Sequence, residues 1–300
     1  MVQIEWDLLV AADLFLSGLG AGAYITAALA DIKGGKKYEK LARFGSHLSW
    51  PLIIIGLGIL ILHMGRPELN NPTHIMNIFS NLPSSMLTIE ALLSGAVIAI
   101  GAATSFLWLA RWKKIWLRTL VEIVGIVTAS CLAASSGLVL ALSRGIPFWE
   151  SAFLPWIFAI SAVLAGLALV GLTETHLGSL LFPRFSAKPE STILNLITRY
   201  TSMMTLALLI TIAFYLADIA VVGEATVGIS NLVMGSMSII FWPSLIIGFI
   251  VPLALRVSIT KRVKEPGTET GIKFLSLVSF LCIIIGVFAL RYAIMIVGQL

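Results

Sequence analysis

The fold of this protein is decided by long apolar runs, the first of which contains the stretch DLFLSGLGAGAYI, residues 13–25. This run extends over about 6–30, which is long enough to cross the ~30 Å hydrocarbon core of a bilayer as a helix. The acids Glu5 and Asp7 precede it where a signal peptide carries Lys or Arg, so we expect it to remain as a membrane span. The stretch therefore places the carboxyl group of Asp13 about two turns into a membrane-spanning helix.

Similar runs recur along all 300 residues, of which 58% are hydrophobic and 12% are charged. Soluble domains average ~25% charged residues, so we do not expect a soluble enzyme. The pattern predicts an all-α integral membrane protein that forms a single transmembrane domain over residues 1–300. Its eight expected helices span about 6–30, 47–64, 86–110, 119–143, 153–176, 200–222, 231–255 and 273–298.

The basic residues predict the orientation of these helices. Of the 20 Lys and Arg residues, 17 lie in the links 31–46, 111–118, 183–199 and 256–273 or at their edges. By the positive-inside rule these links are cytoplasmic and both termini lie outside. The net charge of +5 then reflects membrane topology, and we expect membrane lipids rather than nucleic acid as partners.

Ionisable residues inside membrane spans are rare and usually face a bundle interior or a cavity. Here they fall into an outer set and an inner set. The outer set is Asp13, His63, Glu90, Asp218 and Arg291, and the inner set is His47, Glu122, Glu174 and His176. A bis-His haem needs two imidazoles at matching depth on facing helices, and the four histidines fit this poorly, so we expect no haem and no metal site.

Two interpretations of Asp13 remain open from the residues alone. The carboxyl group could form a structural ion pair with Arg291, or it could be a protonatable ligand in an outward-facing cavity. For the remaining intramembrane charges the expectation is a structural role or a place on a proton path. These residues are Arg291, Asp218, Glu122 and Glu174.

Short motifs follow one another in order along the helices: FLSGLGAG at 15–22, GRP at 65–67, SSM at 84–86, SG at 136–137, IPFW at 146–149, LRY at 290–292 and GQ at 298–299. With this order and spacing the sequence resembles the NrfD/PsrC family. Members of that family are the membrane anchor and quinone-binding subunit of complex iron–sulfur molybdoenzymes such as polysulfide reductase.

The resemblance implies two packed four-helix bundles and a site for a quinone of the menaquinone type near the outer face. It also implies two partners: a four-cluster ferredoxin-like iron–sulfur subunit above that site, and a molybdopterin catalytic subunit. The iron–sulfur clusters and molybdopterin would reside only in these partners. The protein would lie in the cytoplasmic membrane, with the site and the partners on the extracytoplasmic face.

The resemblance also suggests residues for the quinone site. Family members place a polar quinone contact just before the F-L-x-G-L motif, a His in polysulfide reductase and Asp13 here. A Tyr-Thr-Gly of the fourth helix corresponds to residues 135–137, where Ser135 replaces the Tyr; His63 and Met64 precede Gly65 where the family has an Asp. The expected quinone contacts are Asp13, Ser17, His63, Glu90, Ser135 and Ser136. Asp13 would exchange a proton with the quinone, as a general acid–base does.

The outer links 65–85 and 144–152 contain Pro, Asn and aromatic residues, and we expect them to dock the iron–sulfur subunit through Arg66, Arg144 and Trp149. The predicted function is therefore the quinone-reactive membrane anchor of a respiratory oxidoreductase, in which this subunit holds the quinone site only. A secondary transporter or proton-conducting protein is the alternative, because Pro51, Pro243 and Pro252 interrupt expected helices. A purely structural anchor is a third possibility.

Overall fold

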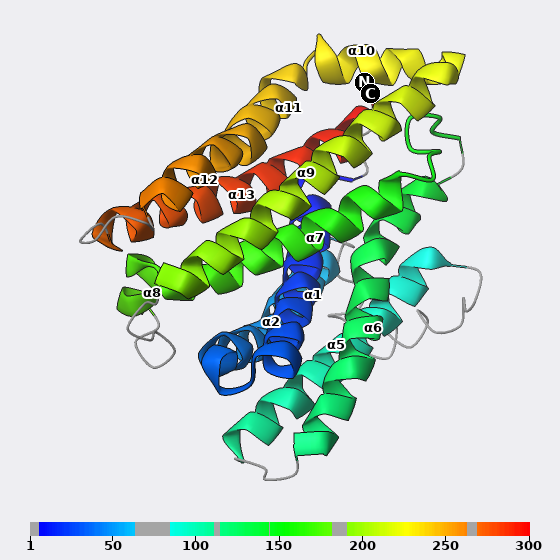
Figure 1. Cartoon of the computed structure of the whole chain (residues 1–300). Helices are drawn as coiled ribbons and strands as arrows, with labels where there is room; N and C mark the ends of the chain where they lie inside the picture. Colours follow the sequence, from blue (N-terminus) through cyan, green and yellow to red (C-terminus); the bar gives the residue numbers. More distant parts are fainter. Residues whose placement is uncertain (1–5, 64–84, 111–114, 144, 182–190, 263–268) are drawn as a thin grey trace.

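The computed structural model describes residues 6–63, 85–110, 115–143, 145–181, 191–262 and 269–300 (Figure 1). All regular structure in these residues is helical. Within them, eight helices are long and apolar enough to cross a membrane. The protein is therefore an all-α, multi-pass membrane protein.

The described spans form two groups of four. The first group consists of α1 (Leu8–Gly34), α2 (Glu39–His63), α5 (Met86–Leu109) and α6 (Ile115–Ala141). The second consists of α7 (Leu154–Gly171), α9 (Ser191–Val221), the interrupted span α11 (Ser238–Leu245) with α12 (Val251–Arg262), and α13 (Glu269–Val297). Shorter elements join them: α8 (His176–Leu181), α10 (Thr226–Val233) and the 3-10 turns Gly35–Tyr38, Leu172–Glu174 and Gly223–Ala225.

Helix contacts show that each group is a bundle. In the first bundle, α1 packs on α2 and α6, and α5 packs on α2 and α6; in the second, α7 packs on α9 and α13, and α12 packs on α9 and α13. Figure 1 shows the two bundles side by side, with α1 and α7 between them. The contacts of α1 with α7 and α13, and of α6 with α7, join the bundles.

The helices extend further than the apolar runs predict. The expected link 31–46 shrinks to the single turn Gly35–Tyr38, because helical hydrogen bonding continues beyond the apolar residues at both ends. Lys33 then lies in the last turn of α1, where a cation is favourable beside the helix dipole. Arg43 pairs with Glu39 at 2.6 Å inside the first turns of α2. Likewise, α9 begins at Ser191 rather than at about 200.

The span expected over 231–255 also differs from the prediction. It begins at Ser238 and is interrupted by the π-helical turn Ile246–Ile250, which lies between Pro243 and Pro252. Proline removes a backbone donor and crowds the preceding turn, and a π-helical turn is one way to absorb that strain.

Local side chains explain where two spans begin. The Asp7 carboxylate accepts the backbone N–H of Leu9 at 2.8 Å, at the start of α1. The Ser85 hydroxyl accepts the N–H of Thr88 at 3.4 Å, at the start of α5. Both side chains satisfy backbone donors that the first helical turn leaves without a partner.

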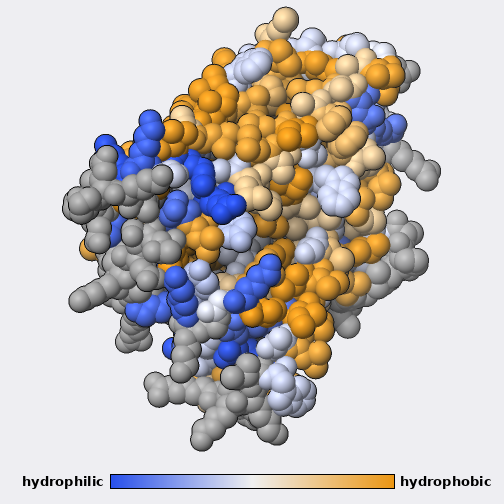
Figure 2. All heavy atoms as spheres, in the orientation of Figure 1, coloured by the Kyte–Doolittle hydropathy of each residue, from blue (hydrophilic) through white to orange (hydrophobic). Residues whose placement is uncertain are grey.

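The molecular surface carries a broad apolar band over the sides of the helices, and hydrophilic residues gather at one end (Figure 2). Basic residues lie where α1 and α12 end and where α2 begins: Lys33, Lys261, Arg262 and Lys40. The N- and C-termini lie together at the opposite end (Figure 1), where the Gln299 amide donates to the carbonyl of Trp6 at 3.0 Å. We call these the basic end and the termini end of the molecule.

The bundles approach most closely where α1 crosses α7. A Cβ atom at Gly22 would lie 1.9 Å from the carbonyl oxygen of Ala162, and one at Gly166 would lie 2.1 Å from the carbonyl carbon of Gly22. Such distances leave no room for a side chain, so the two backbones are in direct contact. Small residues at a helix crossing allow this approach in membranes.

This crossing predicts the effect of adding one methyl group. Gly22→Ala should separate α1 from α7 and lower the free energy of unfolding by ~1–3 kcal/mol, the usual cost of overpacking. Gly95→Ala on α5 is the matched control, since a Cβ there would meet no atom of another described element within 4 Å. That variant should keep or slightly raise stability, because Ala is the better helix former. Thermal unfolding and size-exclusion profiles in detergent test both variants; equal behaviour would contradict the described contact.

Candidate functional site

The termini end of the first bundle buries a carboxyl group and a hydroxyl group from α1. Asp13 is 4% exposed, and Ser17, one turn further along, is 2% exposed and donates to Asp13 Oδ1 at 3.3 Å. Gly56 of α2 faces both: a Cβ atom there would lie 2.9 Å from Asp13 Oδ1. Because position 56 has no side chain, α2 packs directly over the carboxyl group and excludes it from lipid.

A second carboxyl group lies in the same region. Glu90 of α5 is buried, and its Oε1 accepts the hydroxyl of Ser136 from α6 at 2.5 Å. Its Oε2 has no hydrogen-bond partner among the described residues, and the same holds for the hydroxyl of Ser94, one turn further along α5. Glu90 also interacts electrostatically with Asp13 and Arg291. We call the following five residues the carboxyl cluster: Asp13, Ser17, Glu90, Ser94 and Ser136.

The Arg291 guanidinium from α13 is buried where the two bundles meet. It donates to neutral acceptors: Nε to the hydroxyl of Ser161 at 3.0 Å, Nη1 to the carbonyl of Leu14 at 2.9 Å, and Nη2 to the carbonyl of Phe158 at 2.6 Å. The ion pair with Asp13, one of the two open interpretations, is not among the ion pairs of the described residues. The guanidinium instead joins α13 to the carbonyls of α1 and α7.

A glycine of the first helix makes room for this guanidinium. A Cβ atom at Gly18 would lie 2.4 Å from Nη1 of Arg291. On its other side the guanidinium carbon lies 4.8 Å from the centre of the Phe158 ring. The glycine at the centre of the FLSGLG motif therefore admits a buried cation.

The structure brings only part of the expected quinone site together. Asp13, Ser17, Glu90 and Ser136 meet as described above. Ser135 donates its hydroxyl hydrogen to the carbonyl of Leu132 at 2.8 Å within its own helix. The side chain of His63 lies outside the described residues.

At the basic end of the same bundle, Glu122 belongs to a different charged group. Arg118 binds both oxygens of Asp31, with Nε at 2.7 Å and Nη2 at 3.0 Å. The same Nε lies 3.8 Å from Glu122, which is fully buried. The guanidinium carbon of Arg118 also lies 3.8 Å from the centre of the Trp108 ring. Asp31 and Arg118 thus place Glu122 in an ion-pair network far from the carboxyl cluster.

The remaining intramembrane acids lie in the second bundle. Asp218 of α9 accepts the hydroxyl of Ser151 at 2.6 Å, and Tyr215, one turn away, donates to the carbonyl of Phe148 at 2.7 Å. Both contacts hold the turn 145–153 against α9. Glu174 is buried in the 3-10 turn that follows α7.

The docking role expected for Trp149 requires a correction. Its side chain is 1% exposed, its Nε1 donates to the carbonyl of Ile294 at 3.1 Å, and its ring centre lies 5.6 Å from that of Trp6. An indole packed under α13 anchors the turn from inside and cannot contact a partner protein directly. Glu150 is the exposed neighbour on that turn. Arg66 and Arg144 lie outside the described residues.

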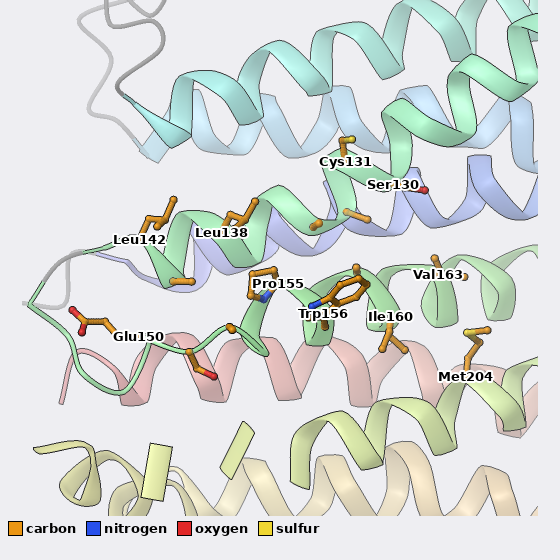
Figure 3. Close-up of a pocket in the computed structure, with 16 residues that line it drawn as sticks. Ser130, Cys131, Leu138, Leu142, Glu150, Pro155, Trp156, Ile160, Val163 and Met204 are labelled. Carbon is orange, nitrogen blue, oxygen red and sulfur yellow. The ribbon is translucent and has the colours of Figure 1, made fainter. Parts of the chain in front are cut away.

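A large cavity lies on the other side of α6 from the carboxyl cluster. It has a volume of about 970 Å³ and is lined by α6, α7 and Met204 of α9 (Figure 3). Ala134 and Leu138 line it, whereas Ser136 between them faces Glu90. Residues two positions apart on a helix point roughly 160° apart, so the cavity and the cluster occupy opposite faces of α6.

Three residues that take part in these buried polar groups do not stand out as candidates in the sequence. Ser94 follows Glu90 by one turn on α5, so helical periodicity is a usable signal for it. Ser161 and Asp31 offer no such signal, because their roles depend on Arg291 and Arg118 arriving from distant helices.

The environment of Arg291 can be tested with two double-mutant cycles. Gly18→Ala alone should destabilise the protein by displacing the guanidinium, and it should be tolerated once Arg291→Met has removed that group. Contacting pairs typically show coupling of ~0.5–3 kcal/mol. Asp13→Asn combined with Arg291→Met should show weaker coupling, because Arg291 bonds to neutral acceptors. Unfolding in detergent measures both cycles; stronger coupling to Asp13 than to Gly18 would restore the ion-pair interpretation.

The whole sequence matches a known protein family. The family model described as "Polysulphide reductase, NrfD" matches residues 1–300. A protein of Haemophilus influenzae named "Protein NrfD homolog" is 26% identical over 325 residues, covering 99% of this sequence and 95% of the relative. The C subunit of polysulfide reductase from Wolinella succinogenes is 27% identical over 323 residues, with the same coverage. The protein belongs to the NrfD family of polysulfide reductase-type membrane subunits.

Proposed function

We propose that this protein is the quinone-reactive membrane subunit of a respiratory oxidoreductase. It would exchange electrons between a menaquinone-type quinone and an iron–sulfur protein docked at the termini end. The observation that carries the proposal is a pair of buried polar groups, Glu90 Oε2 and the Ser94 hydroxyl, that have no hydrogen-bond partner among the described residues. Buried polar groups without partners are uncommon and usually await a ligand, water or ion.

The carboxyl cluster fits a quinone headgroup in its chemistry. A serine hydroxyl can donate to a quinone carbonyl, and a carboxylate can accept from a quinol hydroxyl. Ser94 and Glu90 offer one of each, one turn apart on α5, and Ser136 and Ser17 orient the two carboxyl groups. A quinone would supply the two-electron chemistry, while Asp13 and Glu90 would exchange the accompanying protons.

Helix packing supports this role for the cluster. Gly56 lets α2 pack directly over Asp13, and Gly18 admits the guanidinium of Arg291, which fixes α1 against α7. The carboxyl groups are thus held among helices rather than on loops, which favours a defined geometry. Arg291 adds a fixed positive charge within electrostatic range of Glu90.

The partners follow from the same chemistry. Side chains of this kind move protons but carry no electrons, so electrons have to reach the site from another protein. We propose a four-cluster ferredoxin-like iron–sulfur subunit at the termini end, connected to a molybdopterin catalytic subunit. Since the basic end faces the cytoplasm under the positive-inside rule, these partners would lie on the extracytoplasmic face of the cytoplasmic membrane.

The transporter alternative rests on interrupted helices. The main interruption, the turn Ile246–Ile250, lies in the second bundle, where a Cβ atom at Gly248 would lie 2.5 Å from the Cα of Gly286. Its Phe249 is fully buried in the apolar core. This packing favours a structural role for the interruption.

Replacing Glu90 tests the proposal most directly. Glu90→Gln should assemble normally, because glutamine keeps the shape and can still accept from Ser136. Quinol-linked turnover of the purified complex should fall ~10²-fold or more, as general acid–base losses do. Turnover with an artificial electron donor that bypasses the membrane subunit should be preserved.

Glu122→Gln is the matched control, since it changes another buried glutamate of the same bundle. It should leave quinol-linked turnover near that of the unmodified complex. Unchanged quinol turnover in a well-assembled Glu90→Gln complex would end the proposal and favour a structural anchor. An equal loss in both variants would place proton delivery at the basic end instead.

Orientation is a separate prediction. In a background with Cys131→Ser and Cys282→Ser, a cysteine at the exposed Glu150 should react with an impermeant thiol reagent in intact cells. A cysteine at the exposed Lys261 should react only after the membrane is opened. The reverse pattern would place the carboxyl cluster on the cytoplasmic side.

A further inference from the structure

The large cavity beside α6 opens sideways, toward the position of the surrounding lipid. Trp156 at its edge is 64% exposed and Leu142 is 58% exposed, and Figure 3 shows these side chains around the hollow between α6 and α7. The hollow exists because much of its wall consists of alanines: Ala133, Ala134, Ala141, Ala152 and Ala159. Small side chains here leave a groove where Leu or Ile would fill the space.

The groove has the length of one acyl tail in one leaflet. Its α6 wall runs from Ser130 to Ala141, which corresponds to ~17 Å at the rise of an α-helix. Half of a bilayer's hydrocarbon core is ~15 Å. The groove begins at the termini end, beside Glu150 and Ser151, and ends near Val163 and Met204.

The charge at the mouth is negative in the described residues. Glu150 is the charged side chain that lines the groove, and Ser151 beside it donates its hydroxyl to Asp218 at 2.6 Å. The Glu150 carboxylate accepts the N–H of Gly145 at 3.4 Å and remains exposed. The exposed carboxylate of Glu150 favours a lipid headgroup that carries a positive amine.

We propose that this groove is a binding site for an aminophospholipid of the phosphatidylethanolamine type. One acyl tail would lie along the alanine wall and the ammonium group would face Glu150. The lipid would fill the junction between the bundles, on the face of α6 opposite Ser136. The site is independent of quinone reactivity, because it lies on the other side of α6 from the carboxyl cluster.

The experiment uses the full-length protein in nanodiscs of phosphatidylethanolamine and phosphatidylglycerol in equal amounts. A diazirine in the acyl tail of one lipid or the other labels the protein on illumination, and peptide mass spectrometry locates the label. Phosphatidylethanolamine should label the segments around Ala134 and Trp156 in preference to phosphatidylglycerol. Equal labelling by both lipids in the unmodified protein would overturn the proposal.

Three variants complete the test. Ala159→Leu should fill the groove and remove the labelling, whereas Ala99→Leu on the exposed face of α5 should not. Glu150→Gln should lower the preference for phosphatidylethanolamine by ~2- to 5-fold, as expected for loss of an exposed ion pair.

Labelling that survives Ala159→Leu, or an unchanged preference in Glu150→Gln, would also overturn the proposal. So would a quinone probe that displaces the phosphatidylethanolamine label from these segments, or a cross-link through the groove between two copies of the protein.

Discussion

The buried guanidinium of Arg291 is the interaction on which the arrangement of both bundles depends. A cation inside a membrane protein has no water to solvate it, so its donors have to find acceptors within the protein. Arg291 uses the carbonyls of Leu14 and Phe158 and the hydroxyl of Ser161. These acceptors belong to α1 and α7, whose backbones touch at Gly22, so one side chain of α13 fixes the junction between the bundles.

This choice of acceptors shapes the chemistry of the neighbouring acids. Had Arg291 formed an ion pair with Asp13, the carboxylate would be neutralised and sequestered. Instead, Asp13 and Glu90 each accept a hydrogen bond from a serine, and Glu90 keeps one oxygen without a partner in the described structure. Acids held by hydroxyl groups remain able to take and release protons, which is the property that the proposed quinone chemistry requires.

Helices α5 and α6 of the first bundle each have a polar face toward the bundle interior and an apolar face toward the lipid. The buried stripe of α5 contains polar and small residues, including Glu90, Ser94 and Thr104, while its lipid-facing side is apolar. On α6, Ser136 faces inward to Glu90, while Ala134 faces the groove proposed to hold a lipid. The same few turns of α6 therefore separate a polar interior from a lipid-facing hollow.

The sequence by itself determined the membrane class, the existence of the eight spans and the burial of Asp13, because the length and polarity of a run decide whether it can cross a bilayer. The order of the short motifs also indicated the family, because each motif lies within one short stretch of the sequence. The partners of Arg291, the inward position of Trp149 and the part played by Ser94 came only from the tertiary structure. These depend on how each helix is rotated and how closely glycines let the backbones approach, and neither quantity is encoded within a single span.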